Sequence, residues 1–273
     1  MKKSFITFLL LLVLLLMILA CPAIAKDTRV TLKQAIEVAL LKNKTHPGDN
    51  GNLDVTQANT VALNLAEVVI DLDFARKKYQ SLVEQQKMLQ QEVDKAENDF
   101  KIGKINAKTL DALKQKVIRN DFDLNLYKMQ IDNGEKSFQR ITGTPISEDF
   151  DYNSSYLIVD ASTLSLPPSV TQGKDAVALE KQLNDVIAAY RNLGTLIIAY
   201  IDAGEKLTET ENEFKTGKVG QEKLEAAIVD KEKAKIDALE GKAYYAKLLY
   251  ELDCNLQGFI SRDVKKISNP IFQ

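Results

Sequence analysis

The sequence contains two nearly identical segments, 114 residues apart: Glu97-Asn98-Asp99-Phe100-Lys101-Ile102-Gly103-Lys104 and Glu211-Asn212-Glu213-Phe214-Lys215-Thr216-Gly217-Lys218. An internal repeat of this kind indicates that one structural unit is used twice. On both sides of each copy, apolar residues recur at alternating steps of three and four, the spacing of a heptad seam on an α-helix. The sequence therefore predicts an all-α fold of two long antiparallel coiled-coil hairpins in tandem.

The apolar seams run through both helices of each predicted hairpin. In the first hairpin the seam consists of Leu72, Ala75, Tyr79, Leu82, Gln86, Leu89, Val93, Ala96 and Phe100, then Leu110, Leu113, Val117, Asn120, Leu124, Tyr127, Ile131, Gly134, Phe138 and Ile141. In the second it consists of Val186, Ala189, Leu193, Leu196, Tyr200, Ala203, Leu207, Thr210 and Phe214, then Leu224, Ala227, Lys231, Ala234, Ala238, Gly241, Tyr245, Leu248 and Leu252. A period of 3.5 residues kept over several heptads predicts left-handed supercoiling around a neighbouring helix.

Two of the predicted helices carry a second, narrower apolar stripe. One stripe consists of Ile118, Phe122, Leu126 and Met129, and the other consists of Ile197, Ile198 and Ile201. A helix with two apolar stripes needs neighbours on two sides. Two arrangements would supply them: a sheet or ring of helices, or a four-helix bundle in which the hairpins cover each other's stripes.

The N-terminal segment has the pattern of a secretory signal peptide. A basic start and an apolar run through Ala20 come before the small-residue site Ala23-Ile24-Ala25, which predicts cleavage of residues 1–25. Lipid attachment at Cys21 and an uncleaved anchor are the two alternatives. All three place residues 26–273 outside the cytoplasm, in the cell envelope, and we expect no membrane-spanning segment in the mature chain.

Turn signals divide the chain into six expected segments. They are a signal peptide (1–25), a short N-terminal helix and loop (26–53), hairpin one (54–143), a polar linker with one short strand at most (144–173), hairpin two (174–262) and a tail (263–273). In the short helix, Thr31 and Gln34 have the spacing of a capping box.

The residues around the two repeated glycines are the candidate functional surface. Each glycine follows a predicted helix end, where a left-handed residue commonly closes the helix. The tips consist of Phe100, Lys101, Gly103, Lys104 and Ile105 in hairpin one, and of Phe214, Lys215, Gly217, Lys218 and Val219 in hairpin two. Their lysines either complement the helix dipoles and keep the tips soluble, or form a basic contact surface for a partner.

Composition and motifs argue against several classes of function. A formal net charge of -2 gives no sign of a nucleic-acid partner. The single histidine, His46, lies in a Pro-Gly loop without a nearby cysteine or second histidine, so we expect no metal site. The sequence has no phosphate-binding glycine loop, nucleophile elbow or zinc-helix motif. We therefore predict a protein that is not an enzyme and that has no catalytic residues and no cofactor.

Three motifs carry a family resemblance. They are Thr31-Leu32-x-x-Ala35-x-x-x-Ala39-Leu40-x-x-Asn43, the duplicated aromatic-x-x-Gly tip, and Phe138-x-x-Ile141-x-Gly143. In this order and spacing they resemble the TolC-type outer membrane efflux proteins. The resemblance implies a homo-oligomer, a trimer, whose helices form a hollow tunnel across the periplasm. It also implies that the tips dock a periplasmic adaptor that works with an inner-membrane transporter.

The chain departs from this family in two ways. Membrane strands need about 10 residues each, and the sequence offers no room for two strands per repeat, so we expect a barrel-less relative that keeps the helical module. Family members often have an acidic residue six positions after the tip glycine, whereas this chain has Thr109 and Lys223 there. No gate residue is therefore assigned. The alternative function is a non-transport coiled-coil spacer or scaffold of the envelope.

Overall fold

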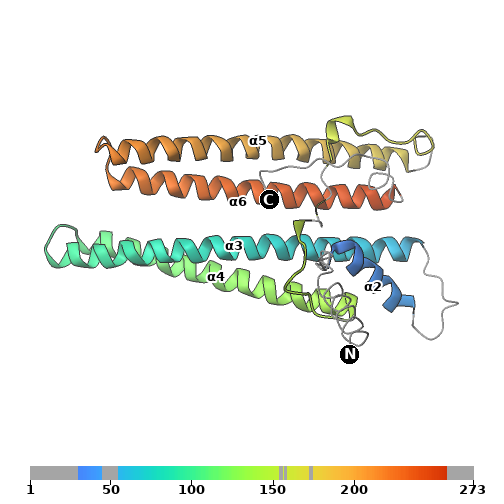
Figure 1. Ribbon diagram of the computed structural model, residues 1–273, viewed down its shortest axis with the longest axis horizontal. Helices are drawn as coiled ribbons and strands as arrows, with labels where there is room; N and C mark the ends of the chain where they lie inside the picture. Colours follow the sequence, from blue (N-terminus) through green and yellow to red (C-terminus); the bar gives the residue numbers. More distant parts are fainter. Residues whose placement is uncertain (1–29, 45–54, 154–155, 157–158, 172–174, 257–273) are drawn as a thin grey trace, which may run out of the picture.

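The computed structural model describes residues 30–44, 55–153, 156, 159–171 and 175–256 (Figure 1). Its helices are α2 (Leu32–Lys44), α3 (Val55–Lys101), α4 (Ala107–Thr142), α5 (Ala176–Lys215), α6 (Gln221–Asn255) and the short 3-10 helix η2 (Ala161–Thr163). No strand occurs among these residues, which confirms the predicted all-α class. The predicted signal peptide, the tail 263–273 and His46 lie outside the described residues.

Helices α3 and α4 lie side by side and run in opposite directions (Figure 1). At 1.5 Å per residue, the 47 residues of α3 make a rod about 70 Å long. Seam residues such as Leu89 are buried between the two helices. The polar seam residue Asn120 is also buried, and its Nδ2 donates to the Leu82 carbonyl at 3.0 Å and to Gln86 Oε1 at 2.6 Å. The seam therefore accommodates a polar residue because its amide is hydrogen-bonded.

Helices α5 and α6 form the second antiparallel pair. Near the ends remote from the tips, Leu193 of α5 and Tyr245 and Leu249 of α6 are buried in a shared core. The Leu196 side chain packs directly over Gly241, where an added Cβ would lie 2.6 Å from Leu196 Cδ1. The glycine in this seam therefore leaves room for a leucine side chain of α5.

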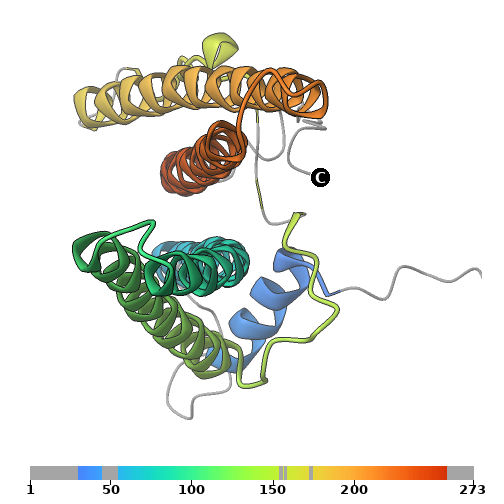
Figure 2. The same ribbon diagram turned by 90° about the vertical axis from the view of Figure 1, so that its left-hand side faces the viewer.

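The two pairs join through α3 and α6, so the long helices form a row in the order α5, α6, α3, α4 (Figures 1 and 2). Among the described helices, α4 and α5 do not contact each other. The four-helix bundle alternative is therefore wrong, because a closed bundle would cover both second stripes. Those stripes are exposed instead, with Phe122 at 70%, Met129 at 61% and Ile198 at 61% of their full accessibility. Ile197 is the exception, since it packs partly buried against the α5–α6 core.

Helix α2 closes the base of the first hairpin, the end opposite the tip. The predicted capping box is confirmed: the Thr31 N–H donates to Gln34 Oε1 at 2.9 Å, and the Gln34 N–H donates to Thr31 Oγ1 at 3.4 Å. Leu32, Ala35 and Ala39 of α2 then pack in a core with residues of α3 and with Phe138 of α4.

The linker after α4 is more than a polar connection. Its described residues, 144–153, 156 and 159–171, are called the strap below. Phe150 packs edge-on against Phe138, with ring centroids 5.8 Å apart. Val159 is buried at the other hairpin, where its carbonyl accepts from the Tyr245 hydroxyl at 2.7 Å. The strap therefore contacts the cores of both hairpins. The short strand that the sequence allowed, over 157–159, lies mostly outside the described residues.

Candidate functional site: the hairpin tips and a charged cluster at the base

The two tips have the same backbone structure. Gly103 and Gly217 have φ angles of 74° and 72°, which confirms the predicted left-handed conformation. The Gly103 N–H donates to the Phe100 carbonyl at 3.0 Å, and the Lys104 N–H donates to the Asp99 carbonyl at 2.8 Å. The second tip repeats both bonds at 3.0 and 2.9 Å. This pair of bonds is the Schellman motif, which satisfies carbonyls at a helix end.

The structure brings the predicted residues of each tip together at one turn. Phe100 and Phe214 are exposed, at 43% and 41% of full accessibility. The four tip lysines, Lys101, Lys104, Lys215 and Lys218, are exposed beside them, whereas Ile105 and Val219 are partly buried. Each tip therefore presents an aromatic ring next to ammonium groups. Lys104 Nζ lies 3.4 Å from Asp99 Oδ1, so this lysine has an ion-pair partner within its own tip.

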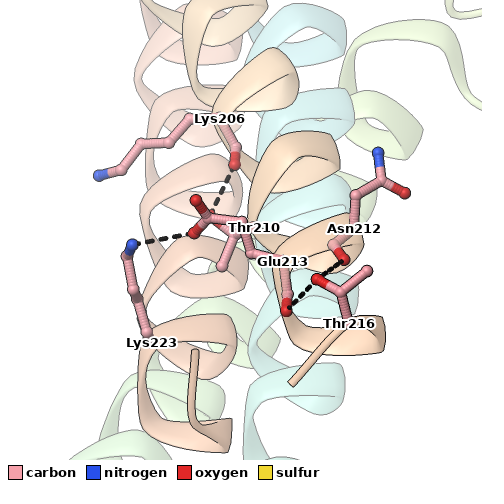
Figure 3. A network of polar contacts seen from close by, with 6 residues as sticks. All are labelled: Lys206, Thr210, Asn212, Glu213, Thr216 and Lys223. Carbon is pink, nitrogen blue, oxygen red and sulfur yellow. Dashed lines mark hydrogen bonds and ion pairs between the residues drawn. The ribbon is translucent and has the colours of Figure 1, made fainter. Parts of the chain in front are cut away.

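The returning helices start differently in the two tips. In α4, Asn106 is the N-cap and its Oδ1 accepts from the Thr109 N–H at 2.9 Å. In α6 the N-cap is Gly220, which has no side chain to accept such a bond. Lys223, at the position equivalent to Thr109, pairs with Glu213 at 3.1 Å (Figure 3).

The outer face of α5 near its tip is acidic. A groove on this face is lined by Glu205, Thr208, Glu209 and Asn212, with Glu213, Thr216 and Lys218 further toward the turn. The Thr216 hydroxyl donates to the carbonyls of Asn212 and Glu213 at 3.1 and 3.0 Å, which secures the last turn of the helix (Figure 3). This face continues the exposed Ile198–Ile201 stripe toward the tip.

The structure also reveals a cluster that the sequence analysis missed. Asp73 of α3 and Lys242 of α6 are only 5% and 4% exposed at the contact between the hairpins. The Tyr156 hydroxyl of the strap donates to Asp73 Oδ2 at 2.6 Å, and Lys77 Nζ donates to the same oxygen at 2.8 Å. Lys242 Nζ lies 4.1 Å from the centroid of the Tyr156 ring, a distance typical of a cation–π contact.

Burial shifts the pKa values of this cluster. Desolvation lowers the pKa of Lys242 to about 8, with the nearby charge of Lys77 lowering it further and Asp73 opposing the shift. Desolvation and the negative charge of Asp73 raise the pKa of Tyr156 far above its ordinary value. Tyr156 is therefore a neutral hydrogen-bond donor at physiological pH, whereas Lys242 changes charge near pH 8.

A second set of polar contacts surrounds the cluster. Arg76 of α3 donates from Nη1 to the Tyr152 hydroxyl and from Nη2 to Glu135 of α4, both at 2.6 Å. Lys247 of α6 pairs with Asp71 of α3. Side chains of the strap and of three helices thus meet at the base.

Cys254 is half-buried near the end of α6 in the free thiol form, and burial raises its pKa to about 11, as fits a packed residue. Within the described ranges, no group of three His, Cys, Asp or Glu side chains could hold a metal ion. The predictions of no cofactor and no enzymatic activity stay predictions.

By length and composition alone, α5 is apolar enough to cross a membrane, and it is the one described helix of this kind. A single helix that passes this test is weak evidence of a membrane segment, and α5 packs along α6 and η2. The expectation of a mature chain without a membrane-spanning segment stays a prediction.

Comparison with protein-family models gives no match, and comparison with curated protein sequences gives none either. The TolC-type resemblance therefore rests on the motifs of the sequence.

Proposed function

We propose that this protein is a TolC-like export component, whose copies assemble side by side into a helical conduit in the cell envelope. One observation carries the proposal: the helices at both ends of the row, α4 and α5, each expose an apolar stripe that nothing in the described part of the subunit covers. Exposed apolar stripes of this kind mark surfaces that bind a partner.

The two stripes lie at matching distances from the tips. The ion pair Asp71–Lys247 shows how the two hairpins are aligned along their length. Asp71 lies 32 residues before Gly103 and Lys247 lies 30 residues after Gly217, so the two tips lie at nearly the same distance from this pair. Ile198 and Ile201 lie 19 and 16 residues from the tip glycine of hairpin two, and the α4 stripe spans 15 to 26 residues from that of hairpin one. With all tips at one end, the α5 stripe of one copy can therefore lie within the length of the α4 stripe of the next.

Several exposed charges beside the two stripes have opposite signs. On the tip side of its stripe, or next to it, α4 exposes the basic residues Lys108, Lys114 and Arg119, of which Lys114 pairs with Glu97 of α3, and it also exposes Asp111 and Asp121. At a similar distance from the tip, α5 exposes the acidic residues Asp202, Glu205 and Glu209. Opposite charges on facing surfaces favour association in one orientation and register. They therefore support contact between α4 of one copy and α5 of the next.

A contact between two different edges of one subunit is heterologous. Such a contact closes into a ring when its rotation permits and gives an open filament when it does not, and the family resemblance implies a ring of three. A ring with a water-filled bore would supply a passive path, and a partner would supply the energy. The tips would all lie at one end of such a ring, where the exposed Phe100 and Phe214 with their lysines offer a docking surface for an adaptor or transporter.

The experiment is a mass measurement by light scattering of the purified protein, followed by electron microscopy of any oligomer. We expect a ring with a bore, and we expect Phe122→Asp and Ile198→Asp each to reduce it to monomers. Val177→Asp is the matched control, because Val177 is 80% exposed on α5 but lies near the base, away from the stripe. A mass that stays monomeric at all concentrations contradicts the conduit.

The alternative is a non-transport spacer or scaffold, which the length of the α3 rod favours. This alternative predicts an elongated particle without a bore. Electron microscopy separates the two functions, since an oligomer with sealed apolar stripes and no central channel supports the scaffold and not the conduit.

A further inference from the structure

We propose that neighbouring copies of this chain meet through a repeat of the contact that already joins the two hairpins within each copy. In that internal contact, α3 of hairpin one lies against α6 of hairpin two (Figure 1). The repeated contact places α5 of one copy against α4 of the next. The inference rests on the proposed side-by-side assembly, and it adds the register of that assembly and the residues that meet.

The two hairpins correspond residue by residue. Helices α3 and α5 end at Lys101 and Lys215, and α4 and α6 begin at Ala107 and Gln221, in each case 114 residues apart. The left-handed glycines of the tips have the same offset. Residue n of hairpin one is therefore equivalent to residue n + 114 of hairpin two, so α3 is equivalent to α5, and α4 to α6.

The internal contact has a defined register. Asp71 of α3 pairs with Lys247 of α6, and this ion pair fixes the level at which the two antiparallel helices meet. Toward the tips, Ser81 lies ten residues from Asp71. Ile236 lies eleven residues from Lys247, so Ser81 and Ile236 lie at nearly the same level. Neither residue belongs to a seam within its own hairpin, yet they are only 7% and 6% exposed.

These two residues share their helix faces with the apolar cluster between the hairpins. Ser81 follows Phe74 by seven residues, which is close to two helical turns. Ile236 precedes Ala243 by the same number. Phe74 and Ala243 belong to the cluster that α3 and α6 form together. The internal contact therefore extends along these faces to the level of Ser81 and Ile236.

The face that α6 buries against α3 is the face that α4 exposes. On α4, the positions equivalent to Ile236 and Ala243 are Phe122 and Met129. Both belong to the exposed stripe, at 70% and 61% of full accessibility. In repeat proteins, an apolar face on a terminal repeat needs a cap or a further repeat to cover it. The α4 stripe therefore lacks the neighbour that its equivalent on α6 has.

Helix α5 offers the face that fits this stripe. The positions equivalent to Phe74 and Ser81 are Ala188 and Thr195, and both are exposed. The Thr195 hydroxyl donates to a carbonyl of its own helix at 3.3 Å, so it needs no partner across the contact. In the repeated contact, Phe122 lies over Thr195 and Met129 over Ala188. Large side chains then face small ones, which allows the two helices to interdigitate.

The internal ion pair also has an equivalent. Asp71 corresponds to Asp185 of α5, and Lys247 corresponds to Asn133 of α4. Both Asp185 and Asn133 are exposed within one copy. An asparagine amide donates hydrogen bonds and a carboxylate accepts them. The contact between copies therefore replaces the ion pair by a hydrogen bond at the same level.

The remaining charges of this register are mixed. Near the base, Lys136 of α4 meets Glu180 of α5, and both side chains are exposed. Lys128 and Arg191 bring two positive charges to the contact, and Asp132, four residues from Lys128 on α4, offsets one of them. The register is therefore set mainly by the apolar residues, with a smaller contribution from charge.

Pairs of introduced cysteines test the register, in a background without the two native cysteines. The two matched pairs are Phe122→Cys with Thr195→Cys and Met129→Cys with Ala188→Cys. The two shifted pairs exchange partners, which displaces one cysteine by seven residues, about 10 Å along the helix. Because α4 and α5 do not contact each other within a copy, a disulfide between them joins two copies.

The extent of linking is measured on non-reducing denaturing gels. We expect the matched pairs to link at least about tenfold faster than the shifted pairs, because cysteines whose Cα atoms are more than about 7 Å apart are not bridged without backbone movement. The pair of Met129→Cys and Ala188→Cys leaves Phe122 intact. It therefore keeps the test valid if Phe122→Cys weakens the assembly.

Light scattering before oxidation separates this inference from the proposed function. A wild-type mass that stays monomeric contradicts the assembly, and the register fails with it. If an oligomer forms but the shifted pairs link faster, or no pair links, the assembly stands and the repeated contact is overturned. Rapid linking of Phe122→Cys alone overturns it as well, because α4 then faces α4 of the next copy.

Discussion

The tips and the base of this molecule are built on different principles. At the tips, a repeated segment gives the same turn twice, with matching φ angles and hydrogen bonds at Gly103 and Gly217. At the base, the residues that join the hairpins occur once each, as with Tyr156 of the strap and the buried pair Asp73 and Lys242. Duplication thus accounts for the form of each hairpin, while the way in which the hairpins join depends on residues outside the repeat.

The largest expected effect comes from truncating the core at the base. Leu249 is fully buried between α5, α6 and the strap, so Leu249→Ala should lower the free energy of unfolding by about 2–5 kcal/mol. Phe214 at the tip is a larger side chain but is exposed, so Phe214→Ala should change it by about 0.5 kcal/mol or less. Urea denaturation followed by circular dichroism measures both.

If the two variants lose equal stability, the base is not the centre of stability that the burial indicates. Retained helix content at zero urea serves as the control, because it shows that each variant still folds.

The second effect compares a buried lysine with an exposed one. Because the folded-state pKa of Lys242 is lowered to about 8, its burial penalty is fully present below pH 8 and declines as pH rises toward the unfolded value of 10.5. Stability should therefore increase between pH 8 and pH 10, by on the order of 1–3 kcal/mol. Toward the tip, the hydrogen bond to Glu97 raises the pKa of the exposed Lys114. The small contribution of Lys114 to the free energy of unfolding should therefore decrease as pH rises.

The measurement is urea denaturation at several pH values in a Cys254→Ser background. That background is needed because burial raises the pKa of the Cys254 thiol to about 11. The thiol therefore lowers the free energy of unfolding as pH rises from 9 to 11, which would mask part of the increase from Lys242. Above pH 10 the buried tyrosines do the same, since burial raises the pKa of Tyr152 to about 12. Lys242→Met should abolish the increase between pH 8 and 10, and an unchanged increase in that variant would assign it to another group.

The contrast between tip and base also explains what the sequence could predict. The seams, the capping box of Thr31 and Gln34, and both glycine turns depend on residues close together in the chain, so their spacing alone predicted them. The exposed stripes on α4 and α5 were visible as second periodic rows. The row of helices was only one of two possibilities, because a stripe shows the need for a neighbour without identifying it.

The base could not be predicted in the same way. Val159 and Leu164 of the strap occur at irregular spacing and carry no periodic signal, although both are buried. Asp73 and Lys242 each follow a seam residue directly, Leu72 and Gly241, and look like ordinary charges on a solvated helix face. A signal was available in Leu65, Ala66, Val69 and Ile70, an apolar run before the seam of α3 that now lies fully buried. That run indicated a further neighbour for α3 as well.

The third effect tests the equivalence of the tips. Gly103→Ala and Gly217→Ala place a Cβ on a residue with positive φ, which should cost about 1–2 kcal/mol at each tip. No other atom lies within 4 Å of the added Cβ in either tip, so the cost should come from the backbone alone and should be equal. Thermal unfolding of the two variants checks this. Unequal losses would show that the surroundings, and not the repeated turn, set the conformation.

The smallest effect uses the place where the tips differ. Asn106→Ala removes the side-chain acceptor at the start of α4 and should cost about 1 kcal/mol, whereas Gly220→Asn adds an acceptor at the start of α6 and should gain a few tenths. Asn106→Gly is the matched control, because it makes the first tip like the second and should cost only a few tenths. If Gly220→Asn destabilises the protein, the start of α6 has a backbone conformation that the Asn106 cap does not share. The similarity of the tips would then end at the glycine turn, so that only the first halves of the two turns, at the ends of α3 and α5, are equivalent.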